Sequence, residues 1–144
     1  MQSFFRQGGI CVNEAKRVIE YFSGDLFVKE LGLEIAELSN RQAVVTVTVR
    51  SNHQNANGCA QGGMLYTVAD FTFALLANLL HSATVTQGGN VQYLRPAKAG
   101  ETLTFTATET AYAGHNTVCQ VVAKNGNGET VCVCSFNGFI KDVK

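Results

Sequence analysis

The chain has 144 residues, of which 46% are apolar, and its 11 basic and 11 acidic side chains give a formal net charge of zero. This length favours one domain over residues 1–144, because chains divide into several domains only beyond about 250–300 residues. A charged fraction of 15% beside so many apolar residues excludes an intrinsically disordered chain, and the zero net charge removes the basic footprint of a general nucleic-acid-binding protein.

Two short helices are predicted in the N-terminal segment, residues 1–32. Residues 13–22 begin with an asparagine that can cap a helix, and their apolar side chains recur on one stripe. Residues 25–31 form a second short helix, which Gly32 closes. The remaining residues, 33–144, are expected to form the core of the domain.

Two strands and a loop follow the N-terminal segment. Residues 33–38 alternate between apolar and polar side chains, and Glu37 is expected on the same face as the apolar ones. Residues 43–49 are rich in Val and Thr, which is typical of a strand. Residues 51–61 carry several Asn and Gly residues and are expected to form a loop.

The most apolar stretch of the chain, residues 62–82, predicts a helix of about 19 residues, roughly 28 Å long. It is apolar on nearly every side, so it is either buried or membrane-spanning. A membrane span would place Asp70 near the bilayer centre at a cost of about 2.5–3.5 kcal/mol. No basic anchors flank the segment, and a buried helix is therefore favoured.

The last part of the sequence is β. Residues 84–94 form a strand with a glycine pair that marks a bend or bulge, and residues 101–111 alternate threonines with apolar side chains. Residues 117–123 and 130–140 form two more strands, joined by a hairpin turn at 125–128. The expected fold is therefore α+β: a long central helix wrapped by a curved antiparallel sheet of five to six strands. A second subunit would cover the remaining face of the helix.

The cysteine pattern argues against a disulfide framework. The chain contains Cys11, Cys59, Cys119, Cys132 and Cys134. Their number is odd, and the first residues lack the basic and apolar runs of a targeting peptide, so the cytoplasm is the expected compartment. No spacing matches a Cys/His metal site, and ordinary buried thiols are favoured.

Asp70 is the outstanding candidate for chemistry. It is the only ionisable side chain between Gln61 and His81. A buried carboxylate is costly unless it is paired, and burial raises its pKa. A hydrogen-bonded structural aspartate is the alternative, but no neighbour in the sequence offers an obvious partner, so a functional role is favoured.

The glycine pair Gly62–Gly63 is the second candidate. At the start of a long helix, backbone N–H groups are unpaired and the positive end of the helix dipole lies behind them. Without side chains, a substrate carbonyl can approach closely, as in an oxyanion hole. A simple chain reversal explains the two glycines equally well.

Taken together, the two candidates predict a shared site. Gly62 and Asp70 are eight residues apart, which is about 12 Å along a helix axis. A general acid or base must lie within hydrogen-bonding reach of the reacting group, so the Asp70 of one chain cannot act on a carbonyl held at its own Gly62. If both act on one substrate, they come from two subunits whose helices run antiparallel at a dimer interface.

The stretch NANGCAQGGMLYTVADFTFALLAN, followed by QYLRPAKAGETL, resembles the hotdog-fold acyl-CoA thioesterases of the PaaI-like group. The resemblance covers residues 30–140. It implies a hotdog fold, assembly into homodimers and then homotetramers, and hydrolysis of an acyl-CoA thioester. It implies no metal and no cofactor beyond the coenzyme A of the substrate, and no nucleic-acid or membrane partner.

The resemblance also implies roles for individual residues. Asp70 falls at the position of the family's catalytic carboxylate, acting as general base or as nucleophile, and Thr86 falls near that acid in the same subunit. The Gly62 N–H would polarise the thioester carbonyl, and Asn55 would orient substrate or water beside it. Gln61 stands where the family has histidine.

Further residues are expected at the edge of the site or away from it. Gly63 and Gln61 are expected to contact the substrate, while Arg95 and Lys98 would meet the phosphates of coenzyme A, with a solvated surface as the alternative. Three histidines are expected to be structural or exposed: His53 in the polar loop is expected to face solvent, His81 to end the helix, and His115 to lie in a turn.

Three other functions remain open. An acyl-carrier-protein thioesterase is a close variant, and the glutamine at position 61, where the family has histidine, leaves a non-catalytic acyl-CoA-binding hotdog protein as the alternative. A hotdog hydratase or dehydratase is disfavoured because no histidine pairs with the acid. The sequence does not identify the acyl group.

Overall fold

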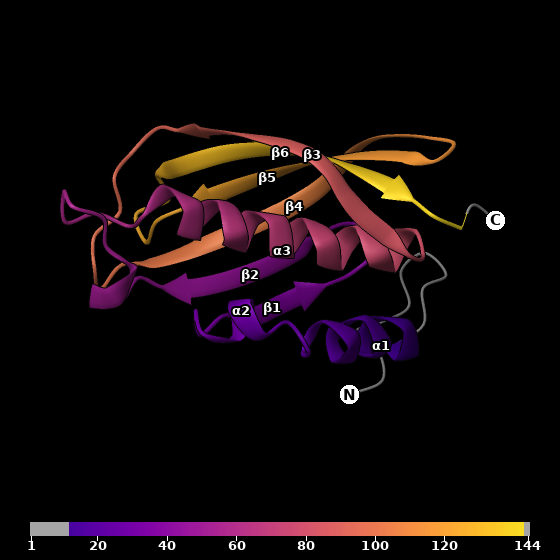
Figure 1. The fold of residues 1–144 in the computed structure, drawn as a ribbon, viewed down its shortest axis with the longest axis horizontal. Helices are drawn as coiled ribbons and strands as arrows, with labels where there is room; N and C mark the ends of the chain where they lie inside the picture. Colours follow the sequence, from indigo (N-terminus) through magenta and orange to yellow (C-terminus); the bar gives the residue numbers. More distant parts are fainter. Residues whose placement is uncertain (1–11, 143–144) are drawn as a thin grey trace.

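The computed structural model describes residues 12–142 (Figure 1), so Cys11 and the start of the predicted N-terminal segment lie outside the described residues. The elements, in chain order, are α1 (Val12–Phe22), α2 (Leu26–Lys29), β1 (Glu34–Leu38), β2 (Ala43–Thr48), the 3-10 helix η1 (Ser51–His53), α3 (Gly62–Leu80), β3 (Thr84–Tyr93), β4 (Thr102–Ala113), β5 (Asn116–Lys124) and β6 (Thr130–Ile140).

The sheet has six strands in the order β1-β2-β4-β5-β6-β3, and every neighbouring pair is antiparallel. The helix α3 lies between β2 and β3 in the sequence and runs along one face of the sheet, where it contacts β2, β3, β4, β5 and β6 (Figure 1). The predicted α+β architecture with a long central helix is confirmed.

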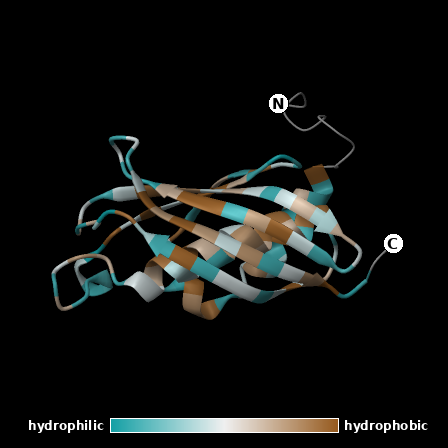
Figure 2. Cartoon of the chain, turned by 90° about the horizontal axis from the view of Figure 1, so that it is seen from above, coloured by the Kyte–Doolittle hydropathy of each residue, from teal (hydrophilic) through white to brown (hydrophobic). Residues whose placement is uncertain are grey.

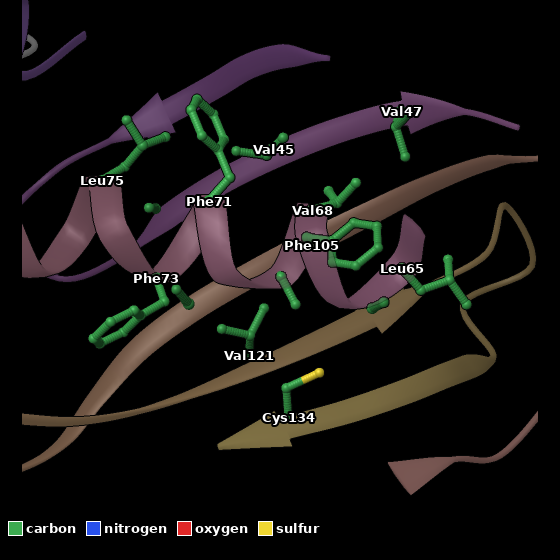
Figure 3. Close-up of a cluster of buried hydrophobic side chains, with 14 of the residues drawn as sticks. Val45, Val47, Leu65, Val68, Phe71, Phe73, Leu75, Phe105, Val121 and Cys134 are labelled. Atoms are coloured by element: carbon green, nitrogen blue, oxygen red, sulfur yellow. The ribbon is translucent and has the colours of Figure 1, made fainter. Parts of the chain in front are cut away.

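The core lies between α3 and the concave face of the sheet. Hydrophobic and hydrophilic residues alternate along the strands in Figure 2, as expected for a sheet with one buried face. Figure 3 shows side chains from α3 and from the strands meeting in one cluster: Leu65, Val68, Phe71, Phe73, Leu75, Val45, Val47, Phe105, Val121 and Cys134. Phe73 of α3 stacks on Phe136 of β6 with ring centroids 5.3 Å apart. The helix is long and apolar enough to cross a membrane, yet most of it is buried in this core.

The cysteines of the described residues are free thiols. Cys119, Cys132 and Cys134 are buried, and burial raises the pKa of the Cys119 thiol to about 11. Reactive thiols are accessible to solvent, and these three are buried, so they act as small core residues, as predicted.

Bulges change the expected alternation at two strands. β1 is irregular between Ile35 and Glu37, and as a result Leu38 is buried while Glu37 is exposed. The expectation that Glu37 shares the apolar face is therefore wrong. In β3 the register shifts between Thr86 and Gly88, which confirms the bulge predicted at the glycine pair.

The central helix has 19 residues, as predicted, and ends at Leu80. The side chain of Asn78 explains this end, because its Oδ1 accepts from Thr84 N at 3.0 Å and its Nδ2 donates to Thr84 O at 3.0 Å. These bonds satisfy the first residue of β3 and turn the chain away from the helix at His81, whose φ of −137° is extended.

The two N-terminal helices pack on the face of α3 that the sheet leaves free. Asp25 caps α2 by accepting from Val28 N at 3.0 Å, and Gly32 follows with a φ of 68°, which favours glycine. The predicted helix over 25–31 is thus shorter than expected.

Candidate active site

A cavity of about 730 Å³ lies on the face of α3 that points away from the sheet. Its walls come from α1, α2, α3 and the first residues of β3. The helix contributes side chains at a spacing of three or four residues, which places them on one stripe: Thr67, Asp70, Phe71, Ala74 and Asn78. Asp70 therefore opens into a cavity whose walls mix apolar side chains, such as Phe71 and Val28, with polar and charged ones, such as Arg17 and Asp25.

Thr86 of β3 is the hydrogen-bond partner of Asp70. Its Oγ1 donates to Asp70 Oδ1 at 2.6 Å, and both residues line the cavity. Burial raises the pKa of Asp70 above its ordinary value, the Thr86 bond opposes this rise, and the charge of Asp25 adds to it. A raised pKa makes the carboxylate a stronger proton acceptor, as a general base requires.

The start of α3 is formed by Gln61 and the two glycines. Gln61 is the N-cap residue, and its side-chain Oε1 accepts from Met64 N at 3.0 Å. Within residues 12–142 no acceptor faces the backbone N–H groups of Gly62 and Gly63. A Cβ on Gly63 would lie 2.8 Å from Gln61 Oε1. Glycine at position 63 therefore leaves room for the glutamine side chain that caps the helix. The helix begins with two free N–H donors.

The loop before α3 is held by Asn55. Its Oδ1 accepts from Asn57 N at 2.9 Å and from Cys59 N at 3.1 Å, while its own backbone N–H donates to Cys59 O at 2.7 Å. The side-chain carbonyl is therefore used inside the loop. In the described part of the chain, the amide Nδ2 has no acceptor and stays available for a ligand.

The expectation that His53 faces solvent is wrong. Its side chain is only 5% exposed, and its Nδ1 accepts from Arg50 N at 3.1 Å. Burial lowers the pKa of His53, and the charge of Arg50 lowers it further, so the ring is neutral. The carbonyl of His53 also accepts from Gln61 N at 2.8 Å, which ties η1 to the start of α3. The bond from Arg50 N explains the burial, and composition alone does not reveal it.

Arg95 and Lys98 lie apart from the Asp70 cavity. Arg95 forms an ion pair with Glu129 at 3.0 Å, and the backbone N–H of Lys98 donates to the carboxylate of Glu101. Both cationic side chains are exposed. The carboxylate of Glu129 offsets the charge of Arg95, which leaves Lys98 as the freer cation of the two.

The other two histidines are structural, as expected. His81 follows α3 directly and pairs with Glu109 at 2.5 Å, and its ring stacks on Tyr112 with centroids 4.3 Å apart. His115 lies in the β4–β5 turn, where its Nδ1 is 2.6 Å from Ile140 O. Across residues 12–142, no three His, Cys, Asp or Glu side chains converge as a metal site would require.

The predicted site residues thus form two groups within one chain. Asp70 and Thr86 lie together in the cavity, whereas Gln61, Gly62 and Asn55 lie at the N-terminal end of α3. Gly62 and Asp70 are eight positions apart on the helix, or about 12 Å along the axis. One residue that the sequence did not single out lies in the second group: Tyr93, whose hydroxyl donates to Gly62 O at 2.7 Å. Its place at the end of a strand, 31 residues away, carries no local sequence signal.

Comparison with known proteins identifies the family. Residues 57–132, which include both halves of the site except Asn55, match the profile of the thioesterase superfamily. This match covers more than half of the chain. The chain belongs to the thioesterase superfamily.

Within this superfamily, the chain is similar to PaaI of Escherichia coli K12, an acyl-coenzyme A thioesterase. The two sequences are 37% identical over 86 residues, which is 60% of this chain and 61% of the relative. The matched segment thus spans less than two thirds of the curated relative. The structure of the E. coli PaaI protein superposes with a TM-score of 0.85 at 28% identity, covering 90% of this chain and 95% of that one. The hotdog fold is confirmed.

A hypothetical thioesterase from Streptococcus pneumoniae TIGR4, solved with coenzyme A, is also similar. Its TM-score is 0.81 at 26% identity, with 88% of this chain and 98% of that chain covered. Two variants of a hypothetical thioesterase from the same organism have been solved, one with an aspartate replaced by alanine and one with a threonine replaced. The replaced threonine follows the aspartate by 16 positions, the same spacing that separates Asp70 from Thr86.

Proposed function

We propose that this protein is an acyl-CoA thioesterase, which hydrolyses an acyl-CoA thioester to a free acid and coenzyme A. The observation that carries the proposal is Asp70, a partly buried carboxylate of raised pKa that lines the cavity and accepts from Thr86 at 2.6 Å. The family membership, the similarity to an acyl-coenzyme A thioesterase and the equal aspartate–threonine spacing in the streptococcal protein support it.

The active site is shared between two subunits. Asp70 and Thr86 of one chain act on a carbonyl held by the partner subunit's Gly62 and Asn55, because about 12 Å separates the two groups within one chain. The edge strand β3 supports such a dimer: it is ten residues long, and most of its residues are exposed. A long open edge invites pairing with another strand. The resulting dimers pair into homotetramers.

Hydrolysis proceeds by one of two routes at Asp70. As a general base, its carboxylate takes a proton from water while the water oxygen attacks the thioester carbonyl carbon. As a nucleophile, it attacks that carbon itself, and water then cleaves the resulting anhydride. In both routes the partner subunit's Gly62 N–H stabilises the oxyanion, the C–S bond breaks and the thiolate of coenzyme A is protonated on release. In a single turnover in ¹⁸O-water, the general-base route places the label in the product acid, whereas the nucleophilic route places it in the Asp70 carboxylate when water attacks the Asp70 carbon of the anhydride.

The test is thiol release from a panel of aryl, short-chain and long-chain acyl-CoAs. The Asp70→Asn variant should lose activity by about 10²–10⁴-fold, the contribution typical of a positioned base. Asp142→Asn, an exposed aspartate outside the Asp70 cavity, is the matched control and should retain activity. Full activity of Asp70→Asn would contradict the proposal.

Folding of Asp70→Asn is measured in the same experiment. A carboxyl whose pKa is raised by folding contributes stability that is complete below its unfolded pKa and is lost as pH rises through its folded pKa. At neutral pH the ionised Asp70 therefore lowers the free energy of unfolding. The side-chain amide of the Asp70→Asn variant still accepts from Thr86 but is uncharged, so this loss of stability disappears. The melting temperature should therefore rise rather than fall.

Gln61 stands where the family has histidine, and this difference supports one other function, a non-catalytic acyl-CoA-binding protein. The Oε1 atom of Gln61 is already bonded to Met64 N at the start of the helix. If wild-type protein binds acyl-CoAs in calorimetry but releases no thiol from any of them, binding is the function. Thioesters of acyl carrier protein belong in the same panel.

The proposal also includes the conditions of the reaction. Catalysis by a carboxylate, water and backbone N–H groups requires no metal or cofactor, so activity should survive treatment with a chelator. The four cysteines of the described residues are free thiols, which supports a reducing compartment such as the cytoplasm.

A further inference from the structure

The helix α3 and the strand β3 meet along a row of three contacts. Figure 1 shows β3 leaving the C-terminal end of α3 and running back along the helix in the opposite direction. Helix positions four residues apart face strand positions that are four and then three residues apart. We call this row the α3–β3 seam, and its pairs are Gly62 with Tyr93, Tyr66 with Gly89, and Asp70 with Thr86.

Two contacts join Tyr93 to Gly62. The hydroxyl of Tyr93 donates to Gly62 O at 2.7 Å, and a Cβ added to Gly62 would lie 2.9 Å from the Tyr93 ring. Real Cβ atoms do not approach that closely, so the ring occupies the space that a side chain at position 62 would need. Burial raises the pKa of Tyr93, and the hydroxyl therefore remains protonated as a donor.

The Gly62 carbonyl, which accepts from Tyr93, belongs to the same peptide group as the Gly63 N–H. The Gly62 N–H lies on the other side of the Gly62 Cα atom. Glycine has more backbone freedom than any other residue, so a helix that begins with two glycines starts with a loose first turn. The bond from Tyr93 limits that freedom at the point where the two free N–H groups lie. Preorganised donors stabilise a developing oxyanion because they do not reorient during the reaction.

We propose that Tyr93 is a positioning residue that fixes the Gly62–Gly63 N–H groups in the orientation required to stabilise the oxyanion. The proposal rests on the proposed thioesterase function. It also gives β3 a double role, because the same strand holds Asp70 through Thr86 and Gly62 through Tyr93. Each subunit thus carries its acid and its oxyanion donors on one helix, both fixed by one strand.

The test compares Tyr93→Phe with Tyr112→Phe. Both tyrosines lie on strands and are equally exposed, at 51% and 52%, but the Tyr112 ring stacks on His81 at the other end of α3. Tyr93→Phe keeps the ring and removes only the hydroxyl. Its kcat should fall about fivefold to tenfold with KM changed less than about twofold, because the oxyanion forms only in the transition state. Tyr112→Phe should match wild type in both constants.

A second pair of variants separates the bond from the packing. Gly62→Ala retains its N–H but displaces the Tyr93 ring, so kcat and the melting temperature should both fall. In a Tyr93→Ala background the same substitution should change the melting temperature little, since the ring is gone.

The outcomes distinguish the two proposals. Wild-type kcat in Tyr93→Phe, measured on a substrate that the wild-type protein hydrolyses, overturns the role of Tyr93 alone. An equal loss in Tyr112→Phe also overturns it, because the effect is then not specific to Gly62. Absence of thiol release by wild type overturns the thioesterase function itself, and the role of Tyr93 with it.

Discussion

At the scale of single residues, Asp70 is held between two opposing influences. Burial in the cavity favours its neutral form, while the hydrogen bond from Thr86 favours its charged form. A base must be ionised to act, yet a carboxylate that ionises too easily is a weak base. Thr86 therefore adjusts the pH at which Asp70 becomes active, in addition to fixing its orientation.

This balance predicts a shift in the pH profile of Thr86→Val. Removal of the donated hydrogen bond leaves burial unopposed, so the pKa of Asp70 should rise further. Because only the ionised acid reacts, kcat/KM falls as pH falls through this pKa, and the midpoint of that acid limb should move to higher pH. A stopped assay of kcat/KM from pH 4 to 8 measures the midpoint, and a midpoint that stays in place or moves to lower pH would show that Thr86 does not stabilise the carboxylate.

At the scale of elements, the α3–β3 seam depends on a glycine at one of two neighbouring positions. A Cβ on Gly89 would lie 2.5 Å from the Tyr66 hydroxyl and 2.6 Å from the Phe136 ring, whereas a Cβ on Gly88 would meet nothing within 4 Å. The bulge after Thr86 sets which of the two glycines faces the helix.

Gly89→Ala should therefore lower the free energy of unfolding by about 1–3 kcal/mol, the usual cost of an overpacked core. Gly88→Ala is the control with the same chemical change and should remain close to wild type. Urea unfolding followed by circular dichroism measures both. Equal stability of the two variants would contradict the packing of β3 on α3.

The elements were largely predictable because their signals are local. The central helix and the strand over 130–140 follow from uninterrupted apolar and alternating patterns. The failure at Glu37 arises from a bulge in β1, which exposes a residue that simple alternation places on the buried face. For the site, Asp70 and Gly62 are visible as chemical exceptions in an apolar stretch. Tyr93 and the burial of His53 depend on tertiary contacts that no local pattern encodes.

At the scale of the whole molecule, the fold divides the proposed machinery between the two ends of an eight-residue segment of α3. The sheet covers one face of the helix, α1 and α2 partly cover the other, and the long edge β3 stays open. Within one chain, Asp70 therefore has no oxyanion donors near it, and the N–H donors at the start of α3 have no acid near them. In the proposed dimer, pairing of two chains would supply each half with its complement and would make activity a property of the dimer.

The most direct test of this account is a heterodimer of two inactive chains, isolated by two different affinity tags. One chain carries Asp70→Asn. The other carries Gly62→Pro, which removes the N–H at a helix position that tolerates proline. It also carries Tyr93→Ala, because the proline ring would otherwise meet the Tyr93 side chain. A shared site predicts one intact pair of Asp70 and Gly62 per heterodimer and thus about half of the wild-type thiol release. A heterodimer no more active than either parent homodimer would contradict the shared site.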